Sequence, residues 1–539
     1  MARRNSNHIP SLIVCMLLTA LFGFCTFYLL VPAANISDDA LWWSLILTFF
    51  AGLAIFGIRA MILNEVDWHN YVSKWPLAIT GIPLAGLIVI GIIFLLASMD
   101  LFHTNDYRNI MTVSDGGNFE TAVPRIETAG DIPVVDRYTA TMLGDRTMGT
   151  MEKYISQYEV SNEYTLIVYQ GRYYRISPLE YGGLVKYWNN RSTGIPGYVL
   201  VDIFTQKATL VELPDNKRIF YAPSACFDQD MMRNLRNQHS SAVFGTAHFE
   251  IDEEGNPFYV IPTLESTASI FGAMKINGVC IMNATTGESK IYALNEVPAW
   301  VDKVYDVTYV MNAIAKHYSL VHGPFNFSDK DVRKTSYAFD TTQYFEVPNS
   351  NGGISIYTGV TSSGNDESNI GFILADVKTG EITYFANPGA EESSAQTSAQ
   401  GQVRDLGYSA GGVMLVNIDG NETYFMTLKD AGLVKKYALV YKLDHNMVVV
   451  EDTVAETVAA YRKLFLVDSS TKGTVQDVYT VIVDGNTTYL FTLVGDEKLY
   501  ASSIKNGYEQ ATDLTTGVEV EFIYSESEDE NIVTTITVK

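Results

Sequence analysis

The chain has 539 residues, of which 37 are basic and 61 are acidic, so its formal net charge is −24. This excess of negative charge argues against nucleic acid as a partner, because an acidic surface repels phosphate groups. The length exceeds the roughly 100–200 residues of a typical domain, so the sequence excludes a single core and predicts several domains.

Three apolar runs occupy the start of the chain, at 11–32, 41–63 and 77–98. Each has the roughly 20 residues that a helix needs to cross the hydrocarbon of a membrane, and each is nearly free of charge. We therefore predict that residues 1–98 form an anchor of three spanning helices. A cleaved signal peptide is the alternative for the first run, although its apolar part is usually only about 7–15 residues long.

Flanking charges predict the orientation of this anchor. The loop between the first two runs contains Asp38 and Asp39 and no basic residue. The basic residues before position 99 are Arg3, Arg4, Arg59 and Lys74. Because basic flanks stay in the cytoplasm, we expect a cytoplasmic N terminus and an extracytoplasmic location, in the cell envelope, for residues 99–539. Acidic and basic residues balance within 1–98, so the net charge belongs to the exterior part.

A repeat follows a juxtamembrane connector with a helix, which we place at 99–160. An aromatic pair followed by strand-forming residues recurs roughly every 80 residues. The pairs begin at Tyr173, Phe258, Tyr344 and Tyr424. Each pair follows a short strand with a tight turn and precedes a second hairpin, which predicts four antiparallel strands per unit. The predicted β-modules are 161–245, 246–332, 333–408 and 409–468.

We expect a helix to close most units. Trp300, Val304, Val307, Met311 and Ile314 have helical spacing after the second unit and follow Pro298. A similar pattern after the fourth unit comprises Val454, Val458, Tyr461 and Phe465. The segment 227–238 after the first unit has a poorer pattern. The segment 389–405 after the third has so few apolar residues that we expect a loop.

The second hairpin of three units contains a recurring turn. Its first positions are Asp202, Asn283 and Asp376, followed four residues later by Gln206, Gly287 and Gly380, respectively. Asp and Asn oxygens cap such turns, and glycine accepts the positive φ that ends them. A calcium site is the alternative, but it needs several closely spaced oxygens. We interpret the repeat as a structural unit.

Residues 469–539 diverge from the units. They contain further strands without a helical pattern, which predicts a small closed β-barrel resembling an oligonucleotide/oligosaccharide-binding (OB) fold. The complete predicted fold class is α+β. It comprises three N-terminal transmembrane helices, tandem modules of a four-stranded antiparallel sheet plus a helix, and this C-terminal barrel.

The hairpin that closes the units, written strand, Asp-x-x-Thr-Gly-Glu, strand, resembles the end of a PepSY domain, a small extracytoplasmic module. Segments between about 130 and 310 are similar to uncharacterised bacterial membrane-anchored proteins. Among them are PVVDRYTATMLGDRTMG, WNNRSTGIPGYVLVD and HFEIDEEGNPFYVIP. The resemblance implies a shared architecture of tandem exterior modules. It implies no activity and no functional residue.

Motifs of known chemistry are not found in the sequence, so we assign no catalytic, cofactor-binding or metal-binding residue and no cofactor. His317 and His322 are five positions apart near a predicted helix end, where a shared metal is less common than two surface histidines. We expect His248 to be a strand residue. We expect solvated surface at the acidic pairs 253–254 and 391–392. Cys226 and Cys280 could form a disulfide or remain two thiols.

Three functional hypotheses follow. The first is a non-enzymatic, membrane-tethered binding or scaffold protein of the cell envelope, whose tandem modules engage a protein or peptide. The second is an envelope enzyme with a site at a seam between modules, with His317 or His322 as the first candidates. The third is an accessory subunit of a membrane sensor or transport complex that acts through the three helices.

Overall fold

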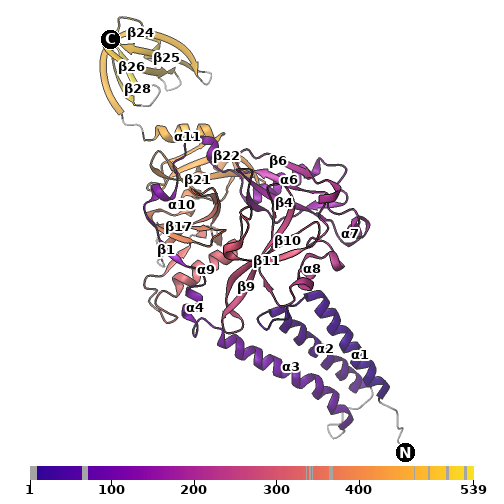
Figure 1. The fold of residues 1–539 in the computed structure, drawn as a ribbon. Coiled ribbons are helices and arrows are strands. Elements are labelled where there is room, and N and C mark those ends of the chain that lie inside the picture. The colour runs from indigo at the N-terminus through magenta and orange to yellow at the C-terminus, as the bar shows by residue number, and fades with distance from the viewer. Residues whose placement is uncertain are drawn as a thin grey trace, which may run out of the picture. The chain divides into compact units, whose positions relative to one another are not determined.

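The computed structural model describes residues 9–62, 71–335, 337–338, 341–342, 344–362, 368–465, 468–483, 486–504, 509–526 and 531–539. The chain divides into two compact units, Met1–Val454 and Ala455–Lys539. Helices and several sheets form the first unit, and a closed barrel dominates the second (Figure 1). The fold is therefore mixed α+β, as predicted. Arg3 and Arg4, on which the orientation prediction depends, lie outside the described residues.

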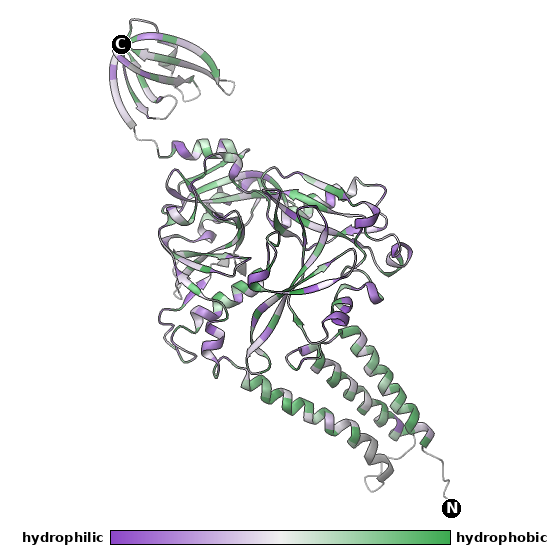
Figure 2. Cartoon of the chain, viewed as in Figure 1, coloured by the Kyte–Doolittle hydropathy of each residue, from purple (hydrophilic) through white to green (hydrophobic). Residues whose placement is uncertain are grey.

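Three helices at the start of the chain are long and apolar enough to cross a membrane. They are α1 (Ile9–Leu30), α2 (Asp39–Ile62) and α3 (Tyr71–Ala97). Figure 2 shows hydrophobic residues along all three. The third begins before the predicted run, because a polar first turn precedes the span Ala78–Ala97. The prediction of three helices long and apolar enough to span a membrane is confirmed.

Close contacts hold the first two membrane helices together. A Cβ added at Gly23 would lie 2.8 Å from the Thr48 side chain, so the glycine permits a close approach of α1 and α2. Arg59 is buried in α2, and its Nε donates a hydrogen bond to Ser11 Oγ of α1 at 3.0 Å. The charge of Arg59 is thus held near a helix end by a partner within the anchor.

A meander of four consecutive antiparallel strands forms the centre of each of four sheets, at the positions that the aromatic-pair repeat predicts. The first comprises β3 (Thr165–Tyr169), β4 (Arg172–Tyr181), β5 (Gly197–Asp202) and β6 (Ala208–Glu212). The second comprises β8 (His248–Ile251), β9 (Pro257–Ala268), β10 (Gly272–Asn283) and β11 (Ser289–Ala293). The third comprises β15 (Phe345–Pro348), β16 (Ile354–Ser362), β17 (Ser368–Asp376) and β18 (Ile382–Ala390). The fourth comprises β20 (Met414–Ile418), β21 (Asn421–Asp430), β22 (Leu433–Tyr441) and β23 (Val448–Glu451).

Each of these sheets also has strands beyond the meander. In each sheet the second meander strand is long enough to pair, along the same edge, with the first meander strand and with one further short strand. These short strands are β2 (Tyr158–Val160), β7 (Val243–Phe244), β12 (Arg333–Thr335) and β19 (Ser409–Ala410). The third sheet gains β1 (Val113–Asp115), which is parallel to β18. Within the described residues the sheets therefore have five strands, or six in the third, and a four-stranded module is not confirmed. A separate pair is β13 (Tyr337–Ala338) with β14 (Thr341–Thr342).

A helix precedes each sheet in the sequence. The helices are α6 (Arg137–Gly149), α8 (Met231–Gln238), α9 (Val307–Ser319) and α10 (Glu392–Gln402). The first contacts β2, β5 and β6, α9 contacts β12, and α10 contacts β19, β21, β22 and β23. Gln238 at the end of α8 bonds to Ser289 of β11. Each helix thus contacts the sheet that follows it in the sequence.

The predicted boundaries of these helices need two corrections. The helix expected from Trp300 begins at Val307, because Asp306 caps it by accepting a hydrogen bond from the Thr308 amide at 2.8 Å. The segment 389–405, predicted as a loop, contains α10. Alanine and the polar residues Glu392 and Gln396 form its buried face, so an apolar pattern was not visible. The helix expected after the fourth sheet is α11 (Val454–Lys463).

The recurring turn has the predicted capping. Oδ1 of Asp202, Asn283 and Asp376 each accepts hydrogen bonds from the amides two and three residues later, at 2.7 to 3.0 Å. Gly287 and Gly380 have φ of 75°, and Gln206 reaches 59° without being glycine. This confirms the interpretation as turn chemistry.

A contact with a tyrosine ring explains why two of these turns end in glycine, at Gly287 and Gly380. The Tyr221 ring packs on Gly287 and the Tyr305 ring packs on Gly380, where an added Cβ would lie 2.5 Å from ring carbon. The Tyr221 amide donates a hydrogen bond to the Ala284 carbonyl, and the Tyr305 amide donates one to the Val377 carbonyl. Each acceptor is the residue after the Asn or Asp that caps the turn. The Val134 amide donates in the same way to Ile203 in the first sheet. The segment before each of these helices therefore docks on a turn of the sheet that follows the helix in the sequence.

The second unit contains a closed barrel in the order β24 (Asp468–Val483), β25 (Asn486–Leu493), β26 (Asp496–Ser503), β28 (Asn531–Val538) and β27 (Glu519–Ser525). Strands β26 and β28 are parallel, whereas the other neighbours are antiparallel. Phe491, Tyr500 and Phe522 pack together in its core. The prediction of a small closed β-barrel is confirmed.

The tyrosine contact predicts unequal costs for two glycine substitutions. Gly380→Ala and Gly352→Ala both force alanine into positive φ, at 75° and 78°, but nothing lies within 4 Å of a Cβ at Gly352. We expect Gly352→Ala to cost about 1 kcal/mol and Gly380→Ala roughly 3 kcal/mol, because the Tyr305 ring must also move. Thermal unfolding of the full-length protein in detergent measures the difference. Equal losses would show that the ring contact is unimportant.

Candidate functional site

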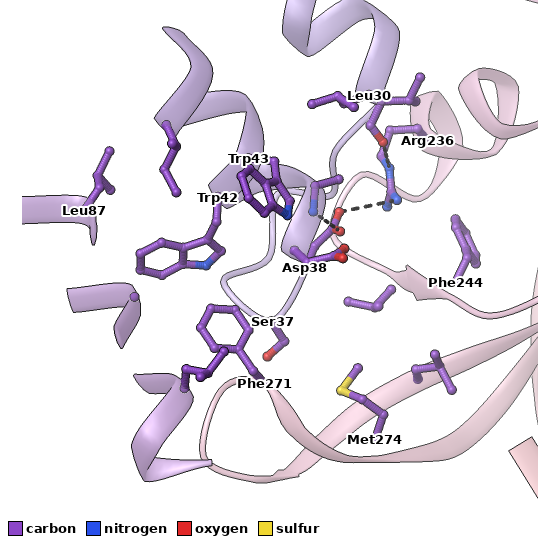
Figure 3. Close-up of a pocket in the computed structure, with 18 of the residues that line it drawn as sticks. Leu30, Ser37, Asp38, Trp42, Trp43, Leu87, Arg236, Phe244, Phe271 and Met274 are labelled. Atoms are coloured by element: carbon purple, nitrogen blue, oxygen red, sulfur yellow. Dashed lines mark hydrogen bonds and ion pairs between the residues drawn. The ribbon is translucent and has the colours of Figure 1, made fainter. Parts of the chain in front are cut away.

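A cavity of about 950 Å³ lies where the membrane helices meet the second sheet (Figure 3). Its walls come from the end of α1, from α2, α3 and α8, and from β7, β9 and β10. Most of the lining is apolar, and its largest side chains are Trp42, Trp43, Phe244 and Phe271. The charged and hydroxyl groups of the lining are Ser37, Asp38, Asp39 and Arg236.

Asp38 organises the polar part of this cavity. Its Oδ1 accepts a hydrogen bond from the Ala40 amide at 3.1 Å, at the start of α2, and its Oδ2 accepts one from the Ala33 amide. Arg236 of α8 lies with Nη2 3.9 Å from the same carboxylate. Burial lowers the pKa of Arg236, and the Asp38 charge opposes that shift. The loop between α1 and α2 is thereby tied to α8.

Trp42 joins the apolar part of the cavity to the second sheet. Its ring meets Phe271 edge-on, with centroids 5.5 Å apart, and meets Phe94 of α3 at 6.0 Å. The Trp42 Nε1 donates a hydrogen bond to the Ile36 carbonyl at 2.8 Å. The Phe271 amide donates to Ser98 Oγ, just beyond α3, at 3.1 Å. The tip of the β9–β10 hairpin is therefore seated on the membrane helices.

These features define what the cavity can bind. The spanning helices supply one apolar wall and the second sheet supplies the other. The charged residues of the lining are Asp38, Asp39 and Arg236. An apolar chain gains free energy by leaving water for such a lining. A molecule with an apolar chain and a polar head therefore matches the cavity.

A second feature is a buried ionic centre between the first sheet, the third sheet and the segment before α9. Arg175 of β4 donates a hydrogen bond to Glu346 Oε2 of β15 at 2.8 Å, and Lys303 before α9 donates to Oε1 at 2.7 Å. All three side chains are buried. Burial alone would raise the pKa of Glu346, but the two cations outweigh it and lower the pKa to about 2. The site holds sheets together and exposes no reactive group.

Two further carboxyls lie beside this centre. Glu250 of β8 accepts hydrogen bonds from the amides of Asp302 and Lys303, and Asp302 Oδ2 accepts one from the Val168 amide at 2.6 Å. Burial raises the pKa of Glu250 to about 8 and that of Asp302 to about 7. Burial lowers the pKa of His248 to about 3, so this histidine is neutral 3.8 Å from Asp306. His248 lies on a strand, as predicted.

The structure gives His317 and His322 different surroundings. His317 Nδ1 lies 3.1 Å from the Arg108 carbonyl, and burial lowers the pKa of this histidine. His322 is exposed, with Nε2 2.7 Å from the Asp331 carboxylate. Within the described ranges, no three His, Cys, Asp or Glu side chains form a group suited to a metal ion. His317 and His322 therefore have separate partners, the Arg108 carbonyl and the Asp331 carboxylate.

The remaining candidates have structural surroundings. Residues 253–254 are exposed, as expected for solvated surface. The same expectation is wrong for Glu392, which is buried and accepts hydrogen bonds from Tyr357 Oη at 2.7 Å and Asn369 Nδ2 at 2.8 Å. Cys226 and Cys280 are both free thiols.

Sequence reasoning did not find the cavity, because its lining combines residues 30–95 with residues 232–274. The only visible signal was the pair Trp42 and Trp43 beside Asp38 and Asp39, at the predicted membrane boundary. Comparison with family models gave no match, and neither did a search of curated proteins.

The pKa of Asp302 predicts a pH-dependent stability. The folded pKa of about 7 exceeds the ordinary value of 3.8, so this group stabilises the fold below pH 3.8 and loses that contribution as pH rises through 7. Near pH 3.8 we expect the Asp302→Asn variant to unfold at about the same temperature as the wild type. Above pH 7 we expect the free energy of unfolding of this variant to exceed that of the wild type by roughly 2–4 kcal/mol.

Thermal unfolding of both proteins across this pH range measures the effect. The other charged groups around Asp302 are Glu250, Glu253 and Lys378, and they are unchanged in the variant. Parallel pH profiles for the two proteins would contradict the assignment.

Proposed function

We propose that the chain is a non-enzymatic, membrane-tethered binding protein of the cell envelope. Its ligand is an amphipathic molecule whose apolar chain occupies the cavity between the anchor and the second sheet. The chain belongs to a lipid or to a lipid-modified polypeptide, which share this chemistry. The sequence suggested a protein or peptide partner, and the cavity favours one that carries an apolar chain.

One observation carries this proposal: spanning helices and an extramembrane sheet share the walls of one apolar cavity. Its volume of about 950 Å³ is at the upper end of small-molecule sites, which are about 300–1,000 Å³. A lipid chain can enter such a site from the bilayer without crossing water. A soluble polar substrate would gain little from these walls.

The extracytoplasmic location rests on loop charges together with one contact. The Ala34 amide, between α1 and α2, donates a hydrogen bond to the Ser240 carbonyl at 2.7 Å. Residues 99–454 therefore lie on the same side of the membrane as the acidic first loop. Because that loop has no basic residue, the positive-inside rule supports the outer side for both.

The barrel supports a modular binding protein as well. Its strand order, with a parallel pair β26–β28 and a short helix at Glu509–Asp513 between β26 and β27, supports the predicted OB-like arrangement. We propose that this unit is a separate exterior module.

Photolabelling tests the ligand. Full-length protein in nanodiscs is labelled with a phospholipid whose acyl chain carries a diazirine, or with a peptide that bears the same acyl chain. The readout is label on Phe244 and Met274, which line the cavity from the extramembrane sheet. We expect label on both residues, and the more efficient probe identifies the source of the chain.

A matched pair of variants controls this experiment. Leu264→Trp fills the cavity, so we expect it to reduce the label at Met274 several-fold. Ile291→Trp adds the same ring on β11 of the same sheet, outside this cavity, and should leave the label unchanged. Label at Met274 that is equal in both variants, or absent from the wild type, would overturn the proposed site.

A further inference from the structure

An exposed apolar surface lies outside the cavity, around the short helix α7 (Leu184–Asn190). We call it the α7 patch, and it consists of Leu184, Val185, Trp188 and Phe227. Their exposed fractions are 60%, 73%, 54% and 45%, respectively. Such a group of large apolar side chains in water marks a contact surface rather than a chance exposure.

The patch is a built structure. Trp188 and Phe227 meet edge-on with centroids 6.2 Å apart, and Phe227 also packs on the buried Tyr187 at 6.4 Å. Phe227 has φ of 59°, a conformation that costs free energy for a bulky residue. The Arg191 guanidinium lies 3.6 Å from the centre of the Trp188 ring. Aromatic rings and a cation thus share one surface.

A single arginine connects this patch to the membrane anchor. Arg233 of α8 donates one hydrogen bond to the Phe227 carbonyl at 2.7 Å and another to the Tyr28 carbonyl at 3.0 Å. Its guanidinium also lies 3.8 Å from the centre of the Tyr28 ring. Tyr28 belongs to the last turn of α1, the end that faces the sheets. Figure 1 shows α8 beside that end of α1, with α7 next to α8.

This connection sets the depth of the patch relative to the bilayer. Tyr28 at the end of α1 and Trp43 near the start of α2 have the positions that aromatic residues take at a membrane boundary. The Phe227 and Tyr28 carbonyls are close enough to accept hydrogen bonds from the same guanidinium group, that of Arg233. The patch therefore lies at the level of the headgroups, where tryptophan and arginine are both favoured.

We propose that the α7 patch rests in the outer leaflet of the membrane that α1, α2 and α3 cross. Leu184 and Val185 enter the boundary between headgroups and acyl chains, and Trp188 lies at headgroup level with Arg191 beside lipid phosphates. This contact is a second attachment, lateral to the anchor, and it prevents the exterior sheets from tilting. It does not depend on the ligand proposed for the cavity.

Fluorine NMR with paramagnetic lipids tests this contact. The full-length protein is labelled with fluorotryptophan and placed, one copy per disc, in nanodiscs of phosphatidylcholine and phosphatidylglycerol. Trp188→Phe identifies the Trp188 signal. Lipids with a gadolinium-chelating headgroup are then added, and we expect the Trp188 signal to broaden until it is lost.

Trp300 provides the internal control. It packs on Phe258, at the end of β9 opposite to the hairpin that touches the anchor, so its signal should persist. We expect the double change Leu184→Glu and Val185→Glu to weaken the broadening of the Trp188 signal, because charged side chains hold this surface out of the acyl-chain boundary while Arg233 keeps it near the anchor. Leu443→Glu, an equally exposed position beyond β22 in the fourth sheet, should leave the broadening unchanged. An unchanged Trp300 signal shows that each variant is folded.

Two results would overturn the proposal. One is a Trp188 signal as sharp as that of Trp300 in the presence of paramagnetic lipid. The other is a Trp188 signal that responds only when several copies share a disc, which would assign the patch to a second copy of the chain.

Discussion

The seating of the second sheet on the membrane helices is the interaction on which the rest of the exterior structure depends. Phe271 at the tip of the β9–β10 hairpin packs on Trp42, while Arg236 of α8 faces Asp38 in the loop after α1. Without these contacts the helices would be a flexible tether. With them, the cavity has two fixed walls and the α7 patch has a fixed height above the bilayer.

Buried polar contacts connect the sheets of the first unit with one another. The ionic centre of Arg175, Glu346 and Lys303 links the first and third sheets to the segment before α9, and the Asp302 and Lys303 amides of that segment donate to Glu250 of the second sheet. Glu392 bonds the third sheet to the start of α10. Removing one member of a buried ion group typically costs about 3–5 kcal/mol, because the others lose their compensation. Such contacts make residues before 455 one body that can transmit the orientation of the anchor.

Local patterns in the sequence were enough to predict the anchor, the meanders and the capped turns. Each depends on residues close in sequence, such as Asp376 and Gly380 within one turn. α10 was missed because its buried face includes Glu392 and Gln396, whose partners are Asn369 of β17 and the Gly411 carbonyl between β19 and β20. β1 was missed because it pairs with β18, far along the chain. The cavity and the α7 patch were missed for the same reason, since only tertiary structure brings α1 and α8 together.

Hydrogen exchange of the full-length protein in nanodiscs tests the seating of the exterior part most directly. The Ala34 and Phe271 amides both lie in loops, where exchange is normally fast. Each donates a hydrogen bond across the junction, to the Ser240 carbonyl and to Ser98 Oγ, respectively. The account predicts slow exchange at both amides, comparable to that of β9. Exchange as fast as in an exposed loop would contradict it.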